Sequence, residues 1–173
     1  RQSEAYVEAR VYKAGQEVLL QWVRDSAFRF FPLQPDDELG AVLHPFDLAT
    51  NKVLALVGRL EVRDWIDVQT CSDKLQHLGL LAWAACGKDP GFSPDAILSE
   101  ARRSSHYTAE EIEPLDFEGD PPDIVQLSRH WKILLGEAAS MIQLLPADEA
   151  GRCVMSADGT LFTGSVSALA DAV

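Results

Sequence analysis

Residues 46–68 read FDLATNKVLALVGRLEVRDWIDV and combine a helical repeat of apolar residues with a cluster of charges. The apolar residues recur three or four positions apart from Ala49 to Leu60, which predicts an amphipathic helix with Asp47 as its N-cap. A core helix does not need so many charges. The charged residues that raise the question of a site are Lys52, Arg59, Arg63, Asp64 and Asp67.

The spacing of these charges leaves two interpretations open. On an unbroken helix, Lys52, Arg59 and Arg63 form one stripe, and Asp64 and Asp67 share another face. Like charges at such spacings repel each other by a few tenths of a kcal/mol per pair. A bound triphosphate or cross-pairing between the two groups would relieve this repulsion. Spacing alone favours a solvated, self-paired face over a phosphate site.

The segment before this helix predicts a β-hairpin. EAYVEARVY alternates apolar and polar residues, KAGQ supplies a glycine turn, and EVLLQWV is a continuous apolar run. Such a run is expected for a strand covered on both faces. The following DSAFRFFPLQPDDELG predicts a loop whose aromatic side chains pack inward, with a short strand at 28–31.

The segment after residue 68 predicts mostly helices. We expect a second helical stretch over about 63–70, a helix from an N-cap at Ser72 to a stop at Gly87, and one opened by Pro94. Further predictions are a short helix with a Thr108–Glu111 capping box and a long helix that starts at Pro121 or Pro122 and stops at Pro146. We also expect a hairpin within 152–162 and a frayed C-terminus over the last nine residues. Strands followed by helices indicate an α+β fold.

Composition limits the function. The 173-residue chain has 27 acidic against 15 basic residues and a formal net charge of -12, whereas nucleic-acid binders are normally basic. The chain alone is therefore not expected to bind nucleic acid well. The three cysteines form no CxxC pair and the four histidines no HExxH motif, so neither a disulfide framework nor a zinc site is suggested. The three unpaired cysteines favour a reducing, cytoplasmic location. The sequence has no run of 18 apolar residues, so we expect no membrane span.

The pattern DLATNKVLALxxRxxxRDWIDV resembles the helical motif of the nucleotidyltransferase-like proteins of the AbiEii/AbiGii toxin family. The flanking segments WVRDSAFRFFPL, LGAVLHPFDLATNKVLAL and LAWAACGKDPGFSPDAILSEARR resemble a bacterial subgroup of the same family, so the resemblance covers roughly residues 16–150. It implies a polymerase-beta-like nucleotidyltransferase fold: a mostly helical α+β protein with a small mixed sheet and a helical C-terminal portion. The implied activity is transfer of a nucleoside monophosphate from NTP to an RNA or protein hydroxyl, by a toxin of a phage-defence toxin–antitoxin system.

The resemblance also assigns roles to the charged residues. It implies that Lys52, Arg59 and Arg63 bind nucleotide phosphates, that Asp64 is a functional acid, and that Asp67 is its catalytic partner or a structural cap. In such folds two Mg²⁺ ions are held by acids that follow a Gly-Ser turn. That turn is not found upstream of residue 46, so we expect it N-terminal to Arg1. Asp25 is the nearest candidate for a third metal-binding acid, because Gln21 occupies the usual position.

Three segments follow from this interpretation: strands of the nucleotidyltransferase-like core over 1–45, a helical portion with the K-R-RDxxD motif over 46–146, and a C-terminal hairpin and tail over 147–173. Expected partners are NTP, a tRNA or protein acceptor, and a cognate antitoxin. Whether the chain is an enzyme depends on the metal-binding motif. The alternative is a non-catalytic binding or scaffold domain, either a degenerate relative or a fragment of such an enzyme.

Overall fold

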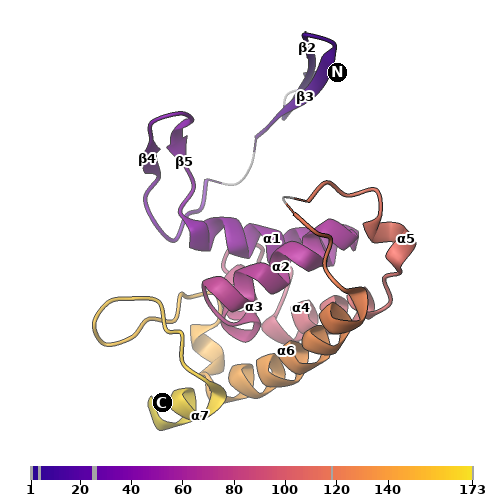
Figure 1. Cartoon of the computed structure of the whole chain (residues 1–173). Coiled ribbons are helices and arrows are strands. Elements are labelled where there is room, and N and C mark those ends of the chain that lie inside the picture. The colour runs from indigo at the N-terminus through magenta and orange to yellow at the C-terminus, as the bar shows by residue number, and fades with distance from the viewer. Residues whose placement is uncertain (1, 4, 25–26, 118, 173) are drawn as a thin grey trace.

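The computed structural model describes residues 2–3, 5–24, 27–117 and 119–172, in which a helical body carries two β-hairpins at one end (Figure 1). The predicted α+β class is confirmed. Both sheets formed by the described residues are antiparallel, where a small mixed sheet was expected. The polymerase-beta-like topology stays a prediction.

The first sheet is a long hairpin with a short third strand. Strands β2 (Tyr6–Lys13) and β3 (Gln16–Val23) pair along their full length, and β1 (Gln2–Ser3) lies at the outer edge of β2. Ala14 and Gly15 form the predicted turn with φ angles of 51° and 80°, and positive φ at both positions is typical of a tight hairpin turn. β3 is exposed along its whole length, so the expectation of a strand covered on both faces is wrong.

The second sheet, formed by β4 (Gln34–Asp36) and β5 (Gly40–Val42), lies where a loop was expected. The strand predicted at 28–31 does not form. Instead, the backbone N–H groups of Phe30 and Phe31 donate to the side chain of Asp47, and both rings pack edge-on against Phe46. These contacts hold the loop against the helical body.

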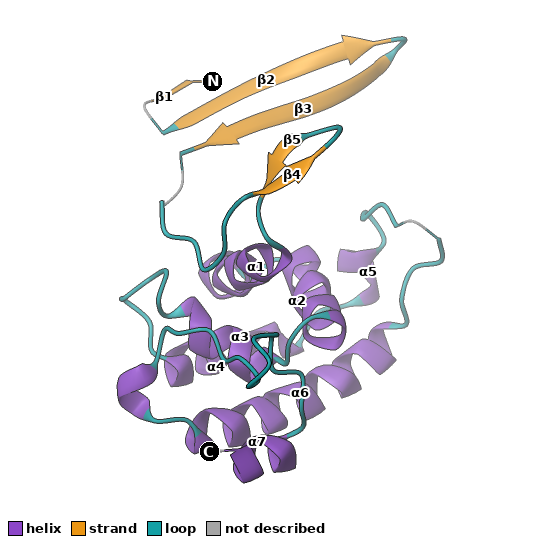
Figure 2. Ribbon diagram, turned by 90° about the vertical axis from the view of Figure 1, so that its left-hand side faces the viewer, coloured by secondary structure: helices purple, strands orange, loops and turns teal. Residues whose placement is uncertain are grey.

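The helical body is built around one short, fully buried helix. Its elements are α1 (Pro45–Arg59), α2 (Val62–Lys74), α3 (Leu78–Ala85), α4 (Pro94–Ala101), η1 (Arg102–Ser105), α5 (Ala109–Ile112), α6 (Ile124–Leu144), η2 (Ala147–Glu149) and α7 (Val166–Ala172). Every residue of α3 is buried, which suits a helix that is apolar on all sides. Helices α1, α2, α4 and α6 surround it (Figure 2).

Several helix ends differ from their prediction. His44, not Asp47, caps α1, because its Nδ1 accepts the N–H of Phe46. Ser72 lies within α2, and His77 caps α3. The Thr108–Glu111 capping box is confirmed. So are the helix that Pro94 opens and the long helix before Pro146.

The C-terminal segment is more ordered than expected. The hairpin predicted within 152–162 is reduced to one isolated bridge between Met155 and Leu161. The prediction that the last nine residues fray is wrong, because Val166–Ala172 forms α7 and buries Leu169 against Leu80 and Met141. None of the helices formed by the described residues is long and apolar enough to cross a lipid bilayer.

Candidate functional site

The charged motif is divided between two helices by a tight turn. α1 ends at Arg59, and Leu60 adopts a left-handed conformation with φ 54° while its N–H still bonds the carbonyl of Leu56. α2 then begins at Val62. The single stripe, which required an unbroken helix, therefore does not form, because Arg63 belongs to a different helix from Lys52 and Arg59.

The turn places Arg59 against Asp64. The guanidinium Nε lies 2.6 Å from Oδ2 of Asp64 and Nη2 lies 2.9 Å from Oδ1, a two-point contact that uses both carboxylate oxygens. Asp64 is fully buried in the first turn of α2, whereas the Arg59 side chain is 45% exposed. The contact joins the end of α1 to the start of α2 and supplies the charge partner that a buried carboxylate requires.

Lys52 extends this contact to Asp67. Its Nζ lies 2.6 Å from Oδ2 of Asp67 and 3.4 Å from Oδ1 of Asp64. The Lys52 and Asp67 side chains are 37% and 46% exposed, so this half of the network faces solvent. Four of the five residues singled out from sequence thus form one network, which we call the α1–α2 ion network: Lys52, Arg59, Asp64 and Asp67.

The network fixes the charge of its members. Burial alone would raise the pKa of Asp64, but the hydrogen bonds and positive charges of Arg59 and Lys52 outweigh burial and hold the pKa below its usual range. Burial would lower the pKa of Lys52, yet Asp67 and Asp64 raise it on balance. Asp64 is therefore an anion and Lys52 a cation at neutral pH.

Two other predicted site residues lie outside the network. Arg63 pairs with Glu61 at 2.7 Å, and both side chains are about half exposed. Asp25 lies outside the described residues. Gln21 sits in the β2–β3 hairpin, where its amide nitrogen donates to Tyr6 Oη at 2.8 Å. Figures 1 and 2 show this hairpin projecting away from α1 and α2.

The described residues do not fit a Mg²⁺ site. No group of three or more His, Cys, Asp or Glu side chains in this part of the chain is arranged to hold a metal ion. Both oxygens of Asp64 are already used by Arg59, which leaves this buried carboxylate a poor metal ligand. The network can instead present two rigid cations, Lys52 and Arg59, to an anion in solvent.

A second buried ion pair was missed from the sequence. Asp47 is fully buried and lies 2.9 Å from Nζ of Lys88, whose side chain is only 6% exposed. Lys88 also donates to Asn51 Oδ1 at 2.8 Å. The two ends of this pair are far apart in sequence, and no local motif marks Lys88. The pair anchors the segment after α3 and the Phe30–Phe31 loop to α1, and we interpret it as structural.

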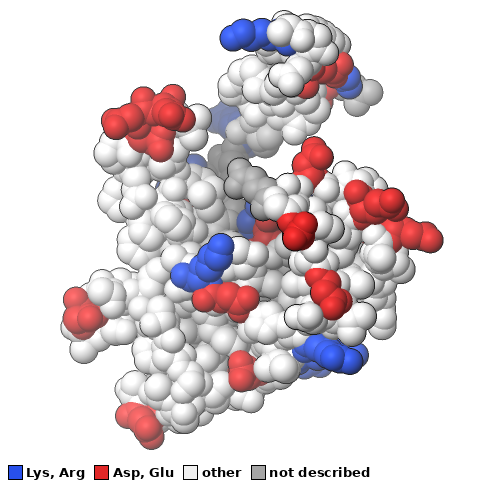
Figure 3. All heavy atoms as spheres, in the orientation of Figure 1, with Lys and Arg blue, Asp and Glu red and all other residues white. Residues whose placement is uncertain are grey.

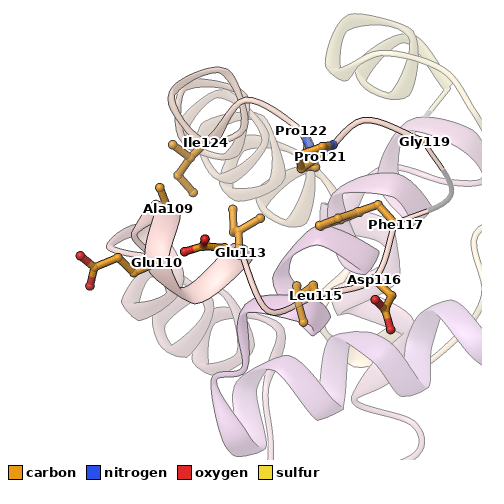
Figure 4. Close-up of a pocket in the computed structure, with 11 residues that line it drawn as sticks. Ala109, Glu110, Glu113, Leu115, Asp116, Phe117, Gly119, Pro121, Pro122 and Ile124 are labelled. Atoms are coloured by element: carbon orange, nitrogen blue, oxygen red, sulfur yellow. The ribbon is translucent and has the colours of Figure 1, made fainter.

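A pocket of about 520 Å³ lies between α5 and the loop that leads to α6 (Figure 4). Apolar side chains form most of its lining, and Figure 4 shows the ring of Phe117 extending into it from the loop. The ionisable side chains around it are all acidic: Glu110, Glu113 and Asp116. Because these carboxylates repel phosphate, we do not expect this pocket to hold a nucleotide.

The chain as a whole is also acidic, with 27 acidic against 15 basic residues. Figure 3 shows acidic side chains on the β4–β5 hairpin and scattered over this face of the helical body. Because the chain has a net charge of -12, it repels an anionic ligand at long range. Such a ligand therefore needs specific cations nearby to bind. The resemblance assigns this role to Lys52, Arg59 and Arg63, and of these Lys52 and Arg59 belong to the α1–α2 ion network.

Comparison with known proteins adds no assignment. No family model matches the chain, and neither a curated protein nor a solved structure matches it. The resemblance to the AbiEii/AbiGii family therefore stays a prediction that rests on the quoted motifs.

Proposed function

We propose that this chain carries the nucleotide-phosphate-binding helices of a nucleotidyltransferase-like toxin of the AbiEii type. The observation that carries the proposal is the α1–α2 ion network, in which four motif residues from two helices meet. Lys52 and Arg59 bind phosphate oxygens of NTP. The buried Asp64 positions both cations, so we propose a positioning role for it in place of direct chemistry.

Phosphate binding at this network requires only that a phosphate oxygen take the place of the Asp67 carboxylate beside Lys52. Asp67 is half exposed and bonds Lys52 through one oxygen, so a phosphate oxygen can replace it without exposing a buried charge. Asp64 remains paired with Arg59 during the exchange, because both its oxygens face the guanidinium. Asp67 thus acts as a surrogate anion that occupies Lys52 when no nucleotide is bound.

The reaction class follows from the resemblance. A hydroxyl of RNA or protein attacks the α-phosphorus of NTP, the new oxygen–phosphorus bond forms, and the α–β phosphoanhydride bond breaks to release pyrophosphate. The described residues do not fit the Mg²⁺ ions that such reactions use, so we assign no catalytic step to them. A cognate antitoxin is a further proposed partner.

Isothermal titration tests nucleotide binding directly. The four common NTPs are titrated into the chain at physiological ionic strength, with and without Mg²⁺, and Lys52→Ala is compared with Lys74→Ala. Lys74 is an exposed lysine in the last turn of α2 and serves as the matched control. We expect Lys52→Ala to weaken binding at least tenfold, about 1.4 kcal/mol, and Lys74→Ala to leave it unchanged. Absence of binding, or equal losses in both variants, overturns the proposal.

One observation favours the scaffold alternative. All four charges of the α1–α2 ion network are paired with one another, so no ligand is needed to relieve repulsion between like charges. In this alternative the network only joins α1 to α2. Nucleotide binding that Lys52→Ala weakens and Lys74→Ala does not separates the two candidates, because a network that only joins α1 to α2 binds no nucleotide.

A further inference from the structure

The β2–β3 hairpin has two chemically different faces. Residues directly opposite each other in an antiparallel pair project to the same side of the sheet. The register pairs Val7 with Trp22, Ala9 with Leu20 and Val11 with Val18. These six side chains form a continuous apolar face, which ends at Lys13 and Gln16 beside the turn.

The opposite face carries polar side chains that bond one another, together with the exposed apolar side chains of Leu19 and Val23. On this side, Gln21 donates to Tyr6 and Glu8, and Arg10 pairs with Glu17. Tyr6 Oη also donates to Glu8 at 2.5 Å. A hairpin with one apolar and one bonded polar face is typical of a sheet whose apolar side packs on another layer.

None of the residues that the structure describes covers the apolar face. Trp22 is 54% exposed and Leu20 39% exposed, and the helices of the same chain cover no residue of β3. A two-stranded hairpin without a packing partner is marginally stable in water. The face therefore needs an occupant from outside the folded chain.

The apolar face is complementary to a copy of itself. Near the turn it contains a hollow of about 460 Å³, lined by Val11, Lys13, Ala14, Gln16, Val18 and Leu20. At the other end of the face stands the bulky side chain of Trp22. If two hairpins stack face to face with their strands antiparallel, Trp22 of each copy enters the hollow of the other. The indole ring then also reaches Lys13, an attractive contact between a cation and an aromatic face.

We propose that the chain forms a two-fold symmetric dimer in which the apolar faces of two β2–β3 hairpins stack antiparallel. An isologous contact of this kind is the commonest symmetry of soluble oligomers. The two sheets form a small sandwich about 10 Å thick.

The charge distribution supports a second copy as the occupant. Within residues 6–23, Glu8 and Glu17 balance Arg10 and Lys13, so the hairpin is neutral although the chain carries -12. Figure 3 shows both basic and acidic side chains on this part of the molecule, whereas the β4–β5 hairpin carries a cluster of acidic ones. Antiparallel stacking places the acidic helical bodies of the two copies at opposite ends of the hairpins, about 26 Å apart for eight-residue strands. This separation exceeds the electrostatic screening length of about 8 Å at physiological salt.

The area of the face sets the strength of the dimer. Two eight-residue strands side by side cover about 26 by 10 Å, roughly 260 Å² per copy. Stable interfaces bury about 800 Å² per partner. We therefore expect a weak dimer that dissociates on dilution. We also expect it to strengthen as salt rises from about 0.01 M, where the screening length of about 30 Å still lets the acidic bodies repel each other, to physiological ionic strength.

Trp22 provides a built-in reporter of this contact. The other three tryptophans, Trp65, Trp83 and Trp131, are buried. Quenching of tryptophan fluorescence by acrylamide therefore reports mainly on Trp22. Sedimentation velocity and quenching are measured on the full chain from about 1 µM to about 1 mM, the range of weak association. We expect the sedimentation coefficient to rise with concentration and quenching of Trp22 to fall with it.

Neighbouring leucines on opposite faces give a matched pair of variants. Leu20→Glu places a charge on the apolar face, and Leu19→Glu places the same charge on the polar face, where Leu19 is 45% exposed. We expect Leu20→Glu to remain monomeric over the whole range and Leu19→Glu to dimerise like the unmodified chain. Circular dichroism checks that both keep the fold. Val18→Lys is a second disruptive variant that retains a β-branched neighbour, Val11, across the strand pair.

The proposal is overturned if the chain stays monomeric at the highest concentration and acrylamide still quenches Trp22 as strongly there as in dilute solution. It is also overturned if Leu19→Glu disrupts association as strongly as Leu20→Glu, or if association weakens with salt. Protection of Trp22 only by another protein or by lipid vesicles, with the purified chain monomeric, likewise excludes a second copy as the occupant.

Discussion

Arg59 is half exposed at the end of α1, yet it contacts both oxygens of Asp64, which is fully buried at the start of α2. The pair spans the Leu60 turn, the point at which the two helices separate. It therefore determines the angle at which α2 leaves α1, and through Lys52 it also links to Asp67 on the surface. The stability of this junction and its ability to bind anions depend on the same residues.

Arg59→Ala is expected to destabilise the fold by about 2–4 kcal/mol, because it leaves a buried carboxylate with only the more distant Lys52 as partner. Arg63→Ala is the matched control. It removes an arginine whose pair with Glu61 is exposed, and it should cost less than about 1 kcal/mol. Urea unfolding followed by circular dichroism gives both values. Equal losses would mean that Asp64 does not depend on Arg59.

Lys88→Met is expected to destabilise the fold by about 3 kcal/mol, since it removes the cation that lies beside buried Asp47. Lys74→Met, at an exposed position of α2, should change stability by less than about 0.5 kcal/mol. The two variants lose the same charge, so the comparison isolates the buried pair. A Lys88→Met chain as stable as the Lys74→Met chain would contradict the prediction.

The same pair gives a pH dependence. Burial alone would raise the pKa of Asp47, but Lys88 and the N–H groups of Phe30 and Phe31 outweigh it and hold the pKa below its usual value. A carboxylate with a lowered pKa stabilises the fold above its unfolded pKa, about 3.9, and this contribution is lost as the pH falls through the folded pKa. The stability difference between the unmodified chain and Lys88→Met should therefore shrink as the pH falls below about 4. A difference that stays constant in acid would exclude this origin.

The sequence predicts the regular helices well, but it predicts the turns between them and their long-range contacts poorly. The bounds of α6 follow from local signals, because Asp123 accepts the N–H groups of Val125 and Gln126 at its start and Pro146 follows its end. The sequence also predicts that α1 and α2 are separate helical stretches, but it gives no signal for the backbone conformation at the break. Leu60 is a non-glycine residue in a left-handed conformation, which tertiary contacts impose and which composition does not reveal.

Long-range partners account for most other differences. The apolar run of β3 predicts that the strand is covered, but it does not show whether the covering layer belongs to the same chain. The expectation that the same fold covers the strand therefore fails. The last residues look too small to pack, yet Leu169 and Val166 of α7 belong to one apolar cluster with Met141 of α6 and Leu80 of α3. At the candidate site, spacing brings Lys52, Arg59, Asp64 and Asp67 to attention, whereas only the fold reveals that Asp64 is buried and Lys88 is paired.

Gly79→Ala is expected to destabilise the fold by about 1–3 kcal/mol through overpacking. A Cβ atom at this position of α3 would lie 2.9 Å from Cα and 3.0 Å from the carbonyl oxygen of Ala138 in α6, where backbone does not yield easily. Gly136→Ala is a control with the opposite sign. It lies within α6 with nothing near its added Cβ, and it should stabilise the fold by about 0.5–1 kcal/mol. Thermal unfolding measures both, and a stabilised Gly79→Ala would show that α3 and α6 are not in close contact.

His77→Asn is expected to flatten the pH dependence of stability between about pH 7 and pH 5, near the ordinary histidine pKa. His77 Nδ1 accepts the N–H of Gly79 at the start of α3, so this nitrogen must be unprotonated, and Nε2 faces Glu137 at 3.1 Å. Burial lowers the pKa of His77, and Glu137 only partly opposes this effect. Because the folded pKa lies below the unfolded value of about 6.5, the neutral cap stabilises the fold above pH 6.5, and its contribution is lost as the pH falls through the folded pKa.

Asparagine caps helices well but does not titrate, so His77→Asn keeps the cap and loses the pH dependence of stability. Urea unfolding over this pH range gives the comparison, with His106→Asn, at an exposed histidine, as the control. A His77→Asn chain that loses stability on acidification as steeply as the unmodified chain would place the titrating group elsewhere in the molecule.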